Sequence, residues 1–231
     1  MVVKNPYTFT PSRVPSEIEQ ALQKIKKGFG YVDDRLETLE YVAISISTLT
    51  GGSTVEVGTT VTTVTLNWTL AGSATVTAQT LTDTTLNTTV RTKAFTGLSL
   101  TTDKTYTLAV TDLEGGTDND TEQVLFRNYR WWGTSASTSL TSGDILTLAN
   151  SEFETDYVQT RNFDASAGVY LYFAWPTSFG ASPAFTVNGL PDSSWVTATV
   201  SHTNASGDTR NFDTWRSLNL LNGSSIDVVV S

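Results

Sequence analysis

A chain of 231 residues with 39% hydrophobic and only 16% charged side chains can bury a core, which excludes wholesale disorder. It has no cysteine, which excludes disulfides and thiolate metal sites. Its net charge is −9 and no lysine follows Lys104, so we expect no nucleic-acid partner, because phosphate binding needs clustered cations. No apolar run reaches the roughly 18 residues of a transmembrane helix, so we expect no membrane span.

Residues 1–15 contain three prolines and no hydrophobic periodicity, which is typical of an extended tail. Such a segment is most often a floppy terminus. The alternative is that it gains order by contact with a larger assembly, because its own composition cannot bury a core. We predict this anchoring role, with Tyr7, Phe9 and Val14 as the contact residues.

A helix is predicted over residues 16–43. Ser16 and Glu19 have the spacing of a capping box, and apolar residues then recur at alternating steps of four and three. These heptad residues are Ile18, Leu22, Ile25, Phe29, Val32, Leu36 and Leu39. The spacing predicts an intermolecular coiled coil, and we expect a homo-oligomer, as a parallel trimer. The alternative is a single amphipathic helix packed on the β-rich part of its own chain.

The hydrophobic period changes to two at Ile44, which predicts half-buried strands over 44–127. Strands are expected in 42–47, 54–57, 61–70, 76–81, 88–95, 105–111 and 122–126, with glycine-containing turns between several of them. This number and spacing of strands predicts an immunoglobulin-like β-sandwich. Trp68 occupies the place of its core tryptophan, and Tyr106 that of a tyrosine corner.

Residues 128–231 are predicted to form a second, C-terminal β-sandwich-like domain. A short helix is expected within 139–153, capped by Ser142 or Asp144. Strands are expected over 169–176, 184–190, 195–203, 209–218 and 225–231, and Asn188-Gly189 predicts a tight hairpin turn. The predicted fold class is therefore mainly β: a coiled-coil helix, an immunoglobulin-like sandwich and a second β-domain.

Candidates for catalysis or metal binding are few. His202 is the only histidine, so we expect a surface residue rather than a catalytic or zinc-binding one. The segment 116–120 offers oxygen ligands that suit calcium, but it lacks the glutamate of an EF-hand, and a plain turn is preferred. Glu152, Glu154 and Asp156 are interpreted as a solvated acidic edge rather than a glycosidase pair. We expect no cofactor, no metal and no enzymatic activity.

Aromatic residues are dense in the last segment. They are Trp131, Trp132, Tyr170, Tyr172, Trp175, Trp195 and Trp215. Most are expected to fill the core and subunit interfaces, and Trp195 is the hardest to explain in that way. Aromatic faces beside polar groups also bind sugar rings or protein hot spots. The candidate surface contacts are Asp192, Trp195, Asn204 and Asp208, with a bacterial surface glycan as the ligand.

The sequence VEVGTTVTTVTLNWTL, followed by AQTL and GLSLTTDKTYTLAVTD, resembles an immunoglobulin-like repeat of bacteriophage fibre and structural proteins. The segments NYRWWGTSASTSLT, VYLYFAWPTSFG, FTVNGL and SHTNASGDTRNFDTWRS resemble the distal module that often follows it. The resemblance implies a trimeric virion component on the outside of the particle, attached to other virion proteins by its N-terminus. It implies no catalytic residues, and it leaves open whether the appendage belongs to head, neck, tail or baseplate.

Three hypotheses follow from the sequence. The first is a virion appendage in which 1–15 anchors, 16–43 trimerises and two β-domains project outward to meet the host surface. The second is a carbohydrate-binding adhesin module. The third is a small glycoside-degrading enzyme.

Overall fold

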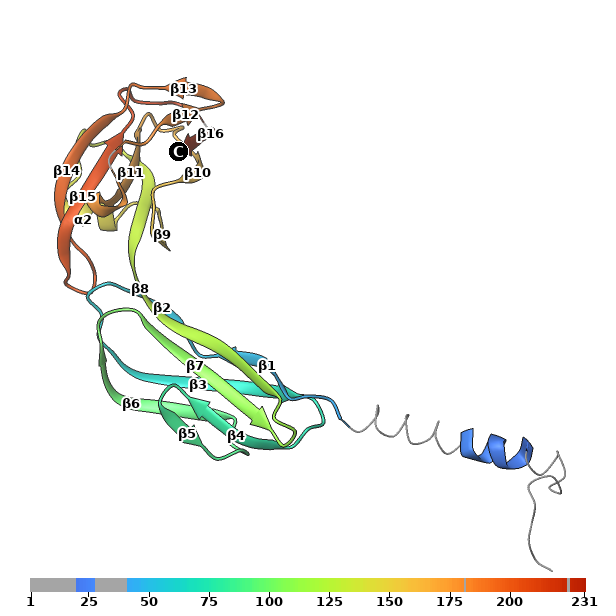
Figure 1. Ribbon diagram of the computed structural model, residues 1–231. Coiled ribbons are helices and arrows are strands. Elements are labelled where there is room, and N and C mark those ends of the chain that lie inside the picture. Colours follow the sequence, from blue (N-terminus) through green and yellow to red (C-terminus); the bar gives the residue numbers. More distant parts are fainter. Residues whose placement is uncertain (1–19, 28–40, 181, 224) are drawn as a thin grey trace, which may run out of the picture. The chain divides into compact units, whose positions relative to one another are not determined.

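The computed structural model describes residues 20–27, 41–180, 182–223 and 225–231. The chain is mainly β with several sheets, as predicted (Figure 1). Several predicted site residues lie outside the described ranges: Tyr7, Phe9, Val14, Ile18, Phe29, Val32, Leu36 and Leu39. Within the described part of the chain, no helix is long and apolar enough to cross a bilayer.

The predicted N-terminal helix is confirmed over 20–27 and is wrong at its C-terminal end. Residues 41–44 have no regular secondary structure. The reason is a competing set of hydrogen bonds: the Tyr41 hydroxyl and the Ile44 N–H both donate to the carboxylate of Asp112. Ile44 is also buried, so the chain enters the β-rich region extended rather than helical.

The strands of the first half follow the predicted period of two. They are β1 Ser45–Thr50, β2 Ser53–Glu56, β3 Val61–Ala71, β4 Val76–Leu81, β5 Thr84–Leu86, β6 Thr92–Leu100, β7 Lys104–Asp112 and β8 Thr117–Ser135. The burial of β3 alternates strictly around Val64, Leu66 and Trp68, as expected for a strand with one face in the core. The predicted turn at 116–120 is wrong beyond Gly116, because residues 117–120 begin β8.

The described residues of the second half form two short helical turns and eight strands. They are α2 Ser142–Leu146, β9 Asn150–Glu154, β10 Gln159–Phe163, β11 Tyr170–Pro176, the 3-10 turn η2 Thr177–Phe179, β12 Phe185–Val187, β13 Leu190–Asp192, β14 Val196–Thr203, β15 Thr209–Arg216 and β16 Ile226–Val230. The cap of α2 is Thr141, which forms a capping box with Asp144, rather than Ser142 or Asp144 itself. Phe153 lies in β9 and is not helical.

The strands form three hydrogen-bonded sheets, of orders β1-β3-β6, β10-β16-β12-β13 and β14-β15-β11-β8-β7-β4-β5. Strand β2 pairs with β8 in parallel, and β9 pairs with β8 antiparallel. The chain forms two compact units, one of Met1–Thr48, Trp68–Val90 and Thr107–Asp120, the other of Leu49–Asn67, Arg91–Tyr106 and Thr121–Ser231. The domain borders predicted at 43/44 and 127/128 remain predictions, and β8 runs through residue 128 without interruption.

Trp68 is the buried tryptophan of the first unit. It is 2% exposed, and its indole N–H donates to Gln79 Oε1 at 3.3 Å, which places a satisfied polar contact inside the core. Gln79 lies on β4, which pairs antiparallel with β7 and β5. The predicted core position of Trp68 is therefore confirmed.

Tyr106, in the second unit, is buried but is not a tyrosine corner. Its hydroxyl has no hydrogen-bond partner among the described residues, whereas a tyrosine corner donates to nearby backbone. The ring instead packs against Phe95, with centroids 5.0 Å apart. Tyr106 therefore contributes apolar packing at the cost of an unsatisfied hydroxyl.

Strand β11 is the centre of the C-terminal part of the second unit. Its residues Leu171–Pro176 are all buried, because both faces of the strand are covered. One face packs into a cluster that includes Phe163, Leu171, Phe173, Trp175, Phe185 and Val228. The other face packs with α2 and β15 through Leu140, Ile145, Leu148, Tyr172, Ala174 and Phe212. The continuous apolar run of β11 thus reflects double-sided burial.

Candidate functional site

A pocket of about 420 Å³ lies beside the hairpin formed by β12 and β13. Its lining includes Phe185, Pro191, Asp192, Ser193, Trp195 and Trp215. The hairpin turn is Asn188-Gly189, and both residues have the positive φ values, 48° and 80°, that the predicted tight turn requires. This turn fixes β13 as the sheet edge, so Asp192 and the segment that follows it are held at the mouth of the pocket.

The walls of the pocket are aromatic rings held by one another. Trp195 stacks on Phe185 with centroids 4.2 Å apart and an interplanar angle of 12°. Trp215 lies 5.6 Å from Phe185, and Phe173 lies 5.6 Å from Trp195. Trp195 and Trp215 are only partly buried, whereas Phe173 and Phe185 are core residues. The partly exposed rings therefore rest on a rigid apolar base.

Of the described residues that line the pocket, Asp192 alone is charged. Its Oδ1 accepts hydrogen bonds from the Ser194 N–H at 2.9 Å and the Ser194 hydroxyl at 2.5 Å. This local turn fixes the carboxylate orientation. Among the described residues Oδ2 has no hydrogen-bond partner, so an acceptor remains available at the pocket.

The four predicted surface contacts fall into two separate places. Asp192 and Trp195 line the pocket, whereas Asn204 and Asp208 form the turn at the far end of β14, about 25 Å along an eight-residue strand. Asn204 donates to the carbonyl of Val57 at 2.7 Å and accepts from the Asp208 N–H at 2.8 Å. The carboxylate of Asp208 accepts from Arg210. The polar groups of this turn thus form hydrogen bonds within the protein.

A second polar group, the Arg130 cluster, comprises Arg130, Glu152, Glu154, Asp156 and the carbonyl of Val158. Arg130 is 5% exposed and lies 2.5, 3.4 and 3.3 Å from the three carboxylates in that order. It also donates to the Val158 carbonyl at 2.7 Å. Burial lowers the pKa of Arg130, while Glu154 and Asp156 raise it. The three carboxylates are partly exposed, at 33%, 38% and 57%, as predicted for an acidic edge, but they also surround a buried cation, which was not predicted.

Sequence reasoning missed this cluster although a signal was present. Glu152, Glu154 and Asp156 have the spacing of one strand face, and Arg130 stands alone in an aromatic run. Arg161 joins the same group through Glu152, and its guanidinium lies 3.8 Å from the ring centroid of Trp132. An arginine within an apolar strand, followed by alternating carboxylates, indicates such an ion-pair network.

The Asp112 cluster joins Asp112 to Tyr41, Ile44, Glu114 and Gly116. Its Oδ2 accepts from the Tyr41 hydroxyl at 3.0 Å and the Ile44 N–H at 3.2 Å. Its Oδ1 accepts from the N–H groups of Glu114 at 3.1 Å and Gly116 at 2.7 Å. Burial alone would raise the pKa of Asp112, but these donors outweigh it, and the pKa lies below its ordinary value.

The single histidine is buried rather than exposed, which overturns the prediction of a surface residue. His202 is 1% exposed, packs edge-on against Phe212, and has its Nδ1 3.2 Å from the Ser142 hydroxyl oxygen. The same hydroxyl accepts from the Thr203 N–H at 2.9 Å, and Nε2 of His202 has no partner among the described residues. Burial lowers the pKa of His202. The pair lacks a carboxylate on the second ring nitrogen, so it does not form a catalytic triad.

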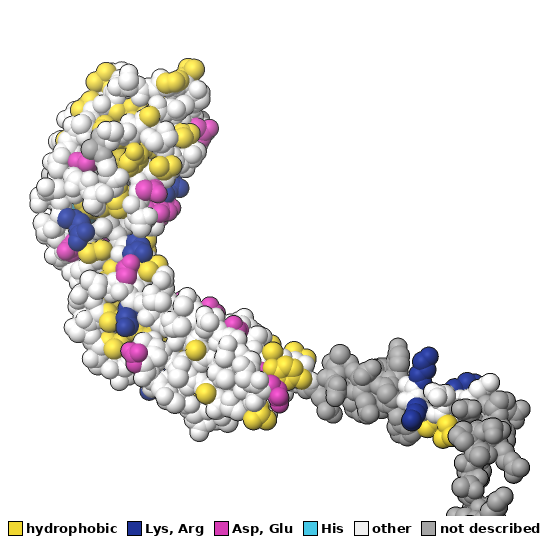
Figure 2. Space-filling view, in the orientation of Figure 1, with side chains coloured by type: hydrophobic (Ala, Val, Ile, Leu, Met, Phe, Trp, Pro, Cys, Tyr) yellow, Lys and Arg dark blue, Asp and Glu magenta, His cyan; other side chains and the backbone are white. Residues whose placement is uncertain are grey.

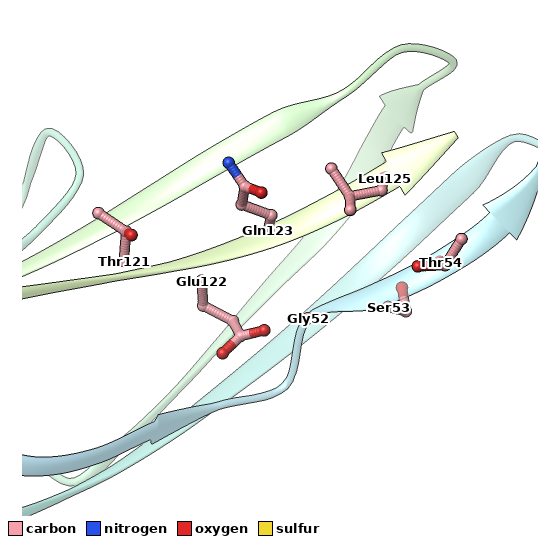
Figure 3. Close-up of a pocket in the computed structure, with 7 residues that line it drawn as sticks. All are labelled: Gly52, Ser53, Thr54, Thr121, Glu122, Gln123 and Leu125. Carbon is pink, nitrogen blue, oxygen red and sulfur yellow. The ribbon is translucent and has the colours of Figure 1, made fainter. Parts of the chain in front are cut away.

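A more open hollow of about 530 Å³ lies where β2 pairs with β8 (Figure 3). The side chain of Glu122 reaches from β8 towards Gly52, while Gln123 and Leu125 point away from it. A Cβ on Gly52 would collide with the Gln123 carbonyl and the Glu122 carboxylate, so glycine permits this close approach. The hollow has no aromatic wall, and Glu122 is its only charged lining residue.

The described residues contain no group of three or more histidine, cysteine, aspartate or glutamate side chains arranged to hold a metal ion. In the segment 116–120, for which a plain turn was preferred over a calcium site, Asp118 lies in β8 and accepts from the Ile46 N–H at 2.7 Å. A strand directs Asp118 and Asn119 to opposite faces, so the three side chains of 118–120 do not converge as loop ligands would.

Comparisons with known proteins give only remote likenesses. No family model and no curated protein matches the chain. Among solved structures, the N-terminal eight Ig domains of Down Syndrome Cell Adhesion Molecule share 7% identity and a TM-score of 0.27, over 77% of this chain and 23% of that one. Chitinase ChiA74 from Bacillus thuringiensis shares 10% identity and a TM-score of 0.25, over 83% of this chain and 27% of that one. The chain thus spans about a quarter of each, and likenesses this low carry no argument about function.

Proposed function

We infer that this protein is a non-enzymatic structural component of a bacteriophage virion: a short trimeric fibre or appendage. Residues 1–15 anchor it to other virion proteins, and the C-terminal β-rich part is exposed on the outside of the particle for host-surface attachment. The resemblance of the sequence after residue 44 to phage fibre proteins supports the virion assignment. The observation that carries the trimer is the exposed apolar face of the helical stretch 20–27.

The helical stretch 20–27 is not packed against any other described residues of its own chain. Every residue of 20–27 is exposed, including Leu22 at 55% and Ile25 at 54%. A helix this short is unstable in water unless an apolar face is buried. Leu22 and Ile25 belong to the heptad series of the sequence, and neighbouring copies of the same helix would cover them in register. Self-association is therefore the simplest way to stabilise the stretch.

The composition of the described surface supports an extracellular structural role. Figure 2 shows that uncharged polar side chains and backbone cover most of the visible β-rich surface, with charged side chains scattered among them. Such a surface, on a chain with a net charge of −9, disfavours anionic partners. It suits a projecting part that stays soluble and makes weak, repeated contacts.

Light scattering on the purified chain tests this function. We expect a mass near three times the 25.0 kDa of one chain. Leu22→Asp combined with Ile25→Asp should dissociate the trimer, because unpaired charges in a coiled-coil seam are costly. Gln20→Asp combined with Gln23→Asp is the matched control, since it adds the same two charges to this helix outside the seam. A monomeric wild-type chain, or dissociation by the control alone, would contradict the trimer.

Attachment is tested separately by deleting residues 1–15. The shortened protein should fold, remain trimeric and fail to join particles during assembly. Normal incorporation of the shortened protein would place the anchor elsewhere.

The second candidate function is a carbohydrate-binding adhesin module outside any virion. The aromatic pocket beside β12 and β13 favours this reading, because stacked tryptophans with an adjacent carboxylate suit a sugar ring. Particle preparations separate the two candidates: a virion component co-purifies with particles, and a free adhesin does not.

A further inference from the structure

We propose that the pocket formed by Phe185, Asp192, Ser193, Trp195 and Trp215 binds the ring of a neutral saccharide. This deepens the attachment role of the proposed function by naming the site and the ligand class. The site itself lies within one compact unit, so its binding can be measured whatever the chain assembles with.

The pocket has the size of a small-molecule site. Its volume of about 420 Å³ falls within the roughly 300–1,000 Å³ of pockets that bind small ligands. It lies beside an edge hairpin, next to the segment that leads from β13 into β14. Pro191 on the edge strand removes one backbone donor, which discourages pairing with another strand. Ligand binding in this region is therefore expected in the pocket rather than by pairing of a strand with the sheet edge.

The aromatic walls are arranged as a platform. One face of Trp195 is occupied by Phe185 at 4.2 Å, and Phe173 supports the pair from the core. Trp215 is fixed from behind by Trp175, whose stacked ring lies 6.1 Å away. Rings held in this way lose little conformational entropy on binding. An aromatic face packs well against the C–H face of a pyranose ring, which is apolar although the rim of the ring carries hydroxyls.

The polar groups select the charge of the ligand. Asp192 presents Oδ2 as a hydrogen-bond acceptor, and the Ser193 hydroxyl can donate or accept. Sugar hydroxyls are donors to a carboxylate and acceptors from a serine, so both groups match a polyol. The lining that the structure describes contains no lysine, arginine or histidine to neutralise an anionic sugar, and Asp192 would repel it. A neutral saccharide is the ligand class that satisfies both conditions.

The test uses the full-length protein and the methyl glycosides of glucose, galactose, mannose and N-acetylglucosamine, with short neutral oligosaccharides and glucuronic acid as an anionic comparator. Binding is followed through the indole N–H signals of the six tryptophans by NMR. We expect at least one neutral sugar to shift the signals of Trp195 and Trp215, and glucuronic acid to bind at least about tenfold more weakly, or about 1.4 kcal/mol.

Variants identify the site. Trp195→Ala should weaken binding at least about tenfold. Trp195→Phe keeps a stacked ring and serves if the alanine variant fails to fold. Asp192→Asn should weaken binding of the neutral sugar and reduce discrimination against glucuronic acid. Leu190→Ser is the matched control, because Leu190 is exposed on the same hairpin and does not line the pocket.

Three results would overturn the proposal: no shift with any neutral sugar, binding that survives Trp195→Ala and Trp195→Phe unchanged, or tighter binding of glucuronic acid. Light scattering on the same samples keeps this outcome separate from the proposed function. A trimer that binds no sugar would contradict the pocket proposal but not the proposed trimer. A monomer that binds sugar would contradict the proposed trimer but not the pocket proposal.

Discussion

The Arg130 cluster and the Asp112 cluster each hold irregular backbone against a sheet with one buried charge, but they stabilise that charge differently. Arg130 lies among three carboxylates and a backbone carbonyl. Among the described residues Asp112 has no cation partner, and it accepts from three backbone N–H groups and one tyrosine hydroxyl. A carboxylate accepts from N–H groups that a tight turn provides, whereas a guanidinium has five donors to satisfy. The buried anion is thus hydrogen-bonded mostly by backbone N–H groups, two of them in the turn that follows it, and the buried cation mostly by side chains distant in the sequence.

This difference has energetic consequences. The carboxylates around Arg130 are partly exposed, with side-chain exposures of 33%, 38% and 57%, so water solvates them if the arginine is lost. The Val158 carbonyl has no such substitute within the cluster. At Asp112 three of the four donors are backbone N–H groups fixed by the fold, and these three cannot rotate away from a wrong partner. We therefore expect substitution of Arg130 to lower the stability of the fold, and substitution of Asp112 to have a smaller effect confined to the backbone around it.

The largest effect is expected for Arg130→Met. Methionine fills much of the volume but leaves the Val158 carbonyl, Glu154 and Asp156 without the arginine donor, while Glu152 keeps its ion pair with Arg161. The free energy of unfolding should therefore fall by about 3 kcal/mol. Urea denaturation followed by tryptophan fluorescence measures this, because Trp131 and Trp132 adjoin the site.

Arg127→Met is the matched control for that substitution. Arg127 lies on the same strand and pairs with Asp103 at 2.7 Å, but the two side chains are 25% and 49% exposed. A pair with this exposure contributes about 0–1 kcal/mol. Equal losses for the two variants would show that burial of Arg130 has no energetic significance, and the comparison would fail.

A smaller and more local effect is expected for Asp112→Asn. The amide oxygen can replace Oδ1 and keep the hydrogen bonds from Glu114 and Gly116. The amide nitrogen would then face the Ile44 N–H and the Tyr41 hydroxyl, and a donor cannot accept from the Ile44 N–H. Residues 41–44 should detach while the turn at 112–116 stays formed.

Amide hydrogen exchange measures in one experiment the protection of the Ile44 N–H, which donates to Oδ2 of Asp112, and of the Gly116 N–H, which donates to Oδ1. We expect faster exchange at Ile44 with little change at Gly116 in Asp112→Asn, and faster exchange at both in Asp112→Ala. Asp118→Asn is a control in the same unit, because Asp118 accepts instead from the N–H groups of Ile46 and Asn119. Loss of protection at Gly116 in the asparagine variant would refute the division of roles between the two oxygens.

Much of the fold was predictable because the period of two is strong in the sequence. The predicted 76–81 strand matches β4 to the residue, and Asn188-Gly189 forms the expected turn. Strands β9 and β10 were missed, because their mixture of charged and polar residues hides the alternation. In both cases long-range ion pairs, which local pattern cannot show, explain why such residues occupy a strand.

The candidate site was predictable only in part. Trp195 stood out because the residues before it are polar, and the structure places it in the pocket with Asp192. Phe185 and Trp215 were not singled out as its partners, because their proximity depends on pairing between β12 and β16 and between β11 and β15. His202 was misjudged for a related reason: a lone polar residue near a turn is usually exposed, but here α2 and Phe212 cover it.

His202 gives the smallest predicted effect and the most specific one, a pH dependence of stability. Burial lowers its pKa in the folded state, so the unfolded chain binds the proton more readily. The contribution of neutral His202 to stability is therefore fully present above the unfolded-state pKa of about 6.5. It is lost as the pH falls from there towards the folded-state pKa. The slope is at most about 1.4 kcal/mol for each pH unit crossed, since one proton is involved.

The pH window isolates this residue. His202 is the only histidine of the chain, and the carboxylates with shifted pKa values, among them Asp103, Asp112 and Asp144, are lowered and titrate only in stronger acid. Melting temperatures between pH 8 and pH 5 should fall for the wild type and stay level for His202→Asn, whose amide can still contact the Ser142 hydroxyl. Parallel slopes in the two proteins would mean that the acid sensitivity arises elsewhere. A wild-type melting temperature that does not change with pH would contradict the prediction, because it would mean that the buried imidazole accepts a proton at no cost. We expect a cost, because Nε2 is buried without a hydrogen-bond partner among the described residues and the ring packs against Phe212.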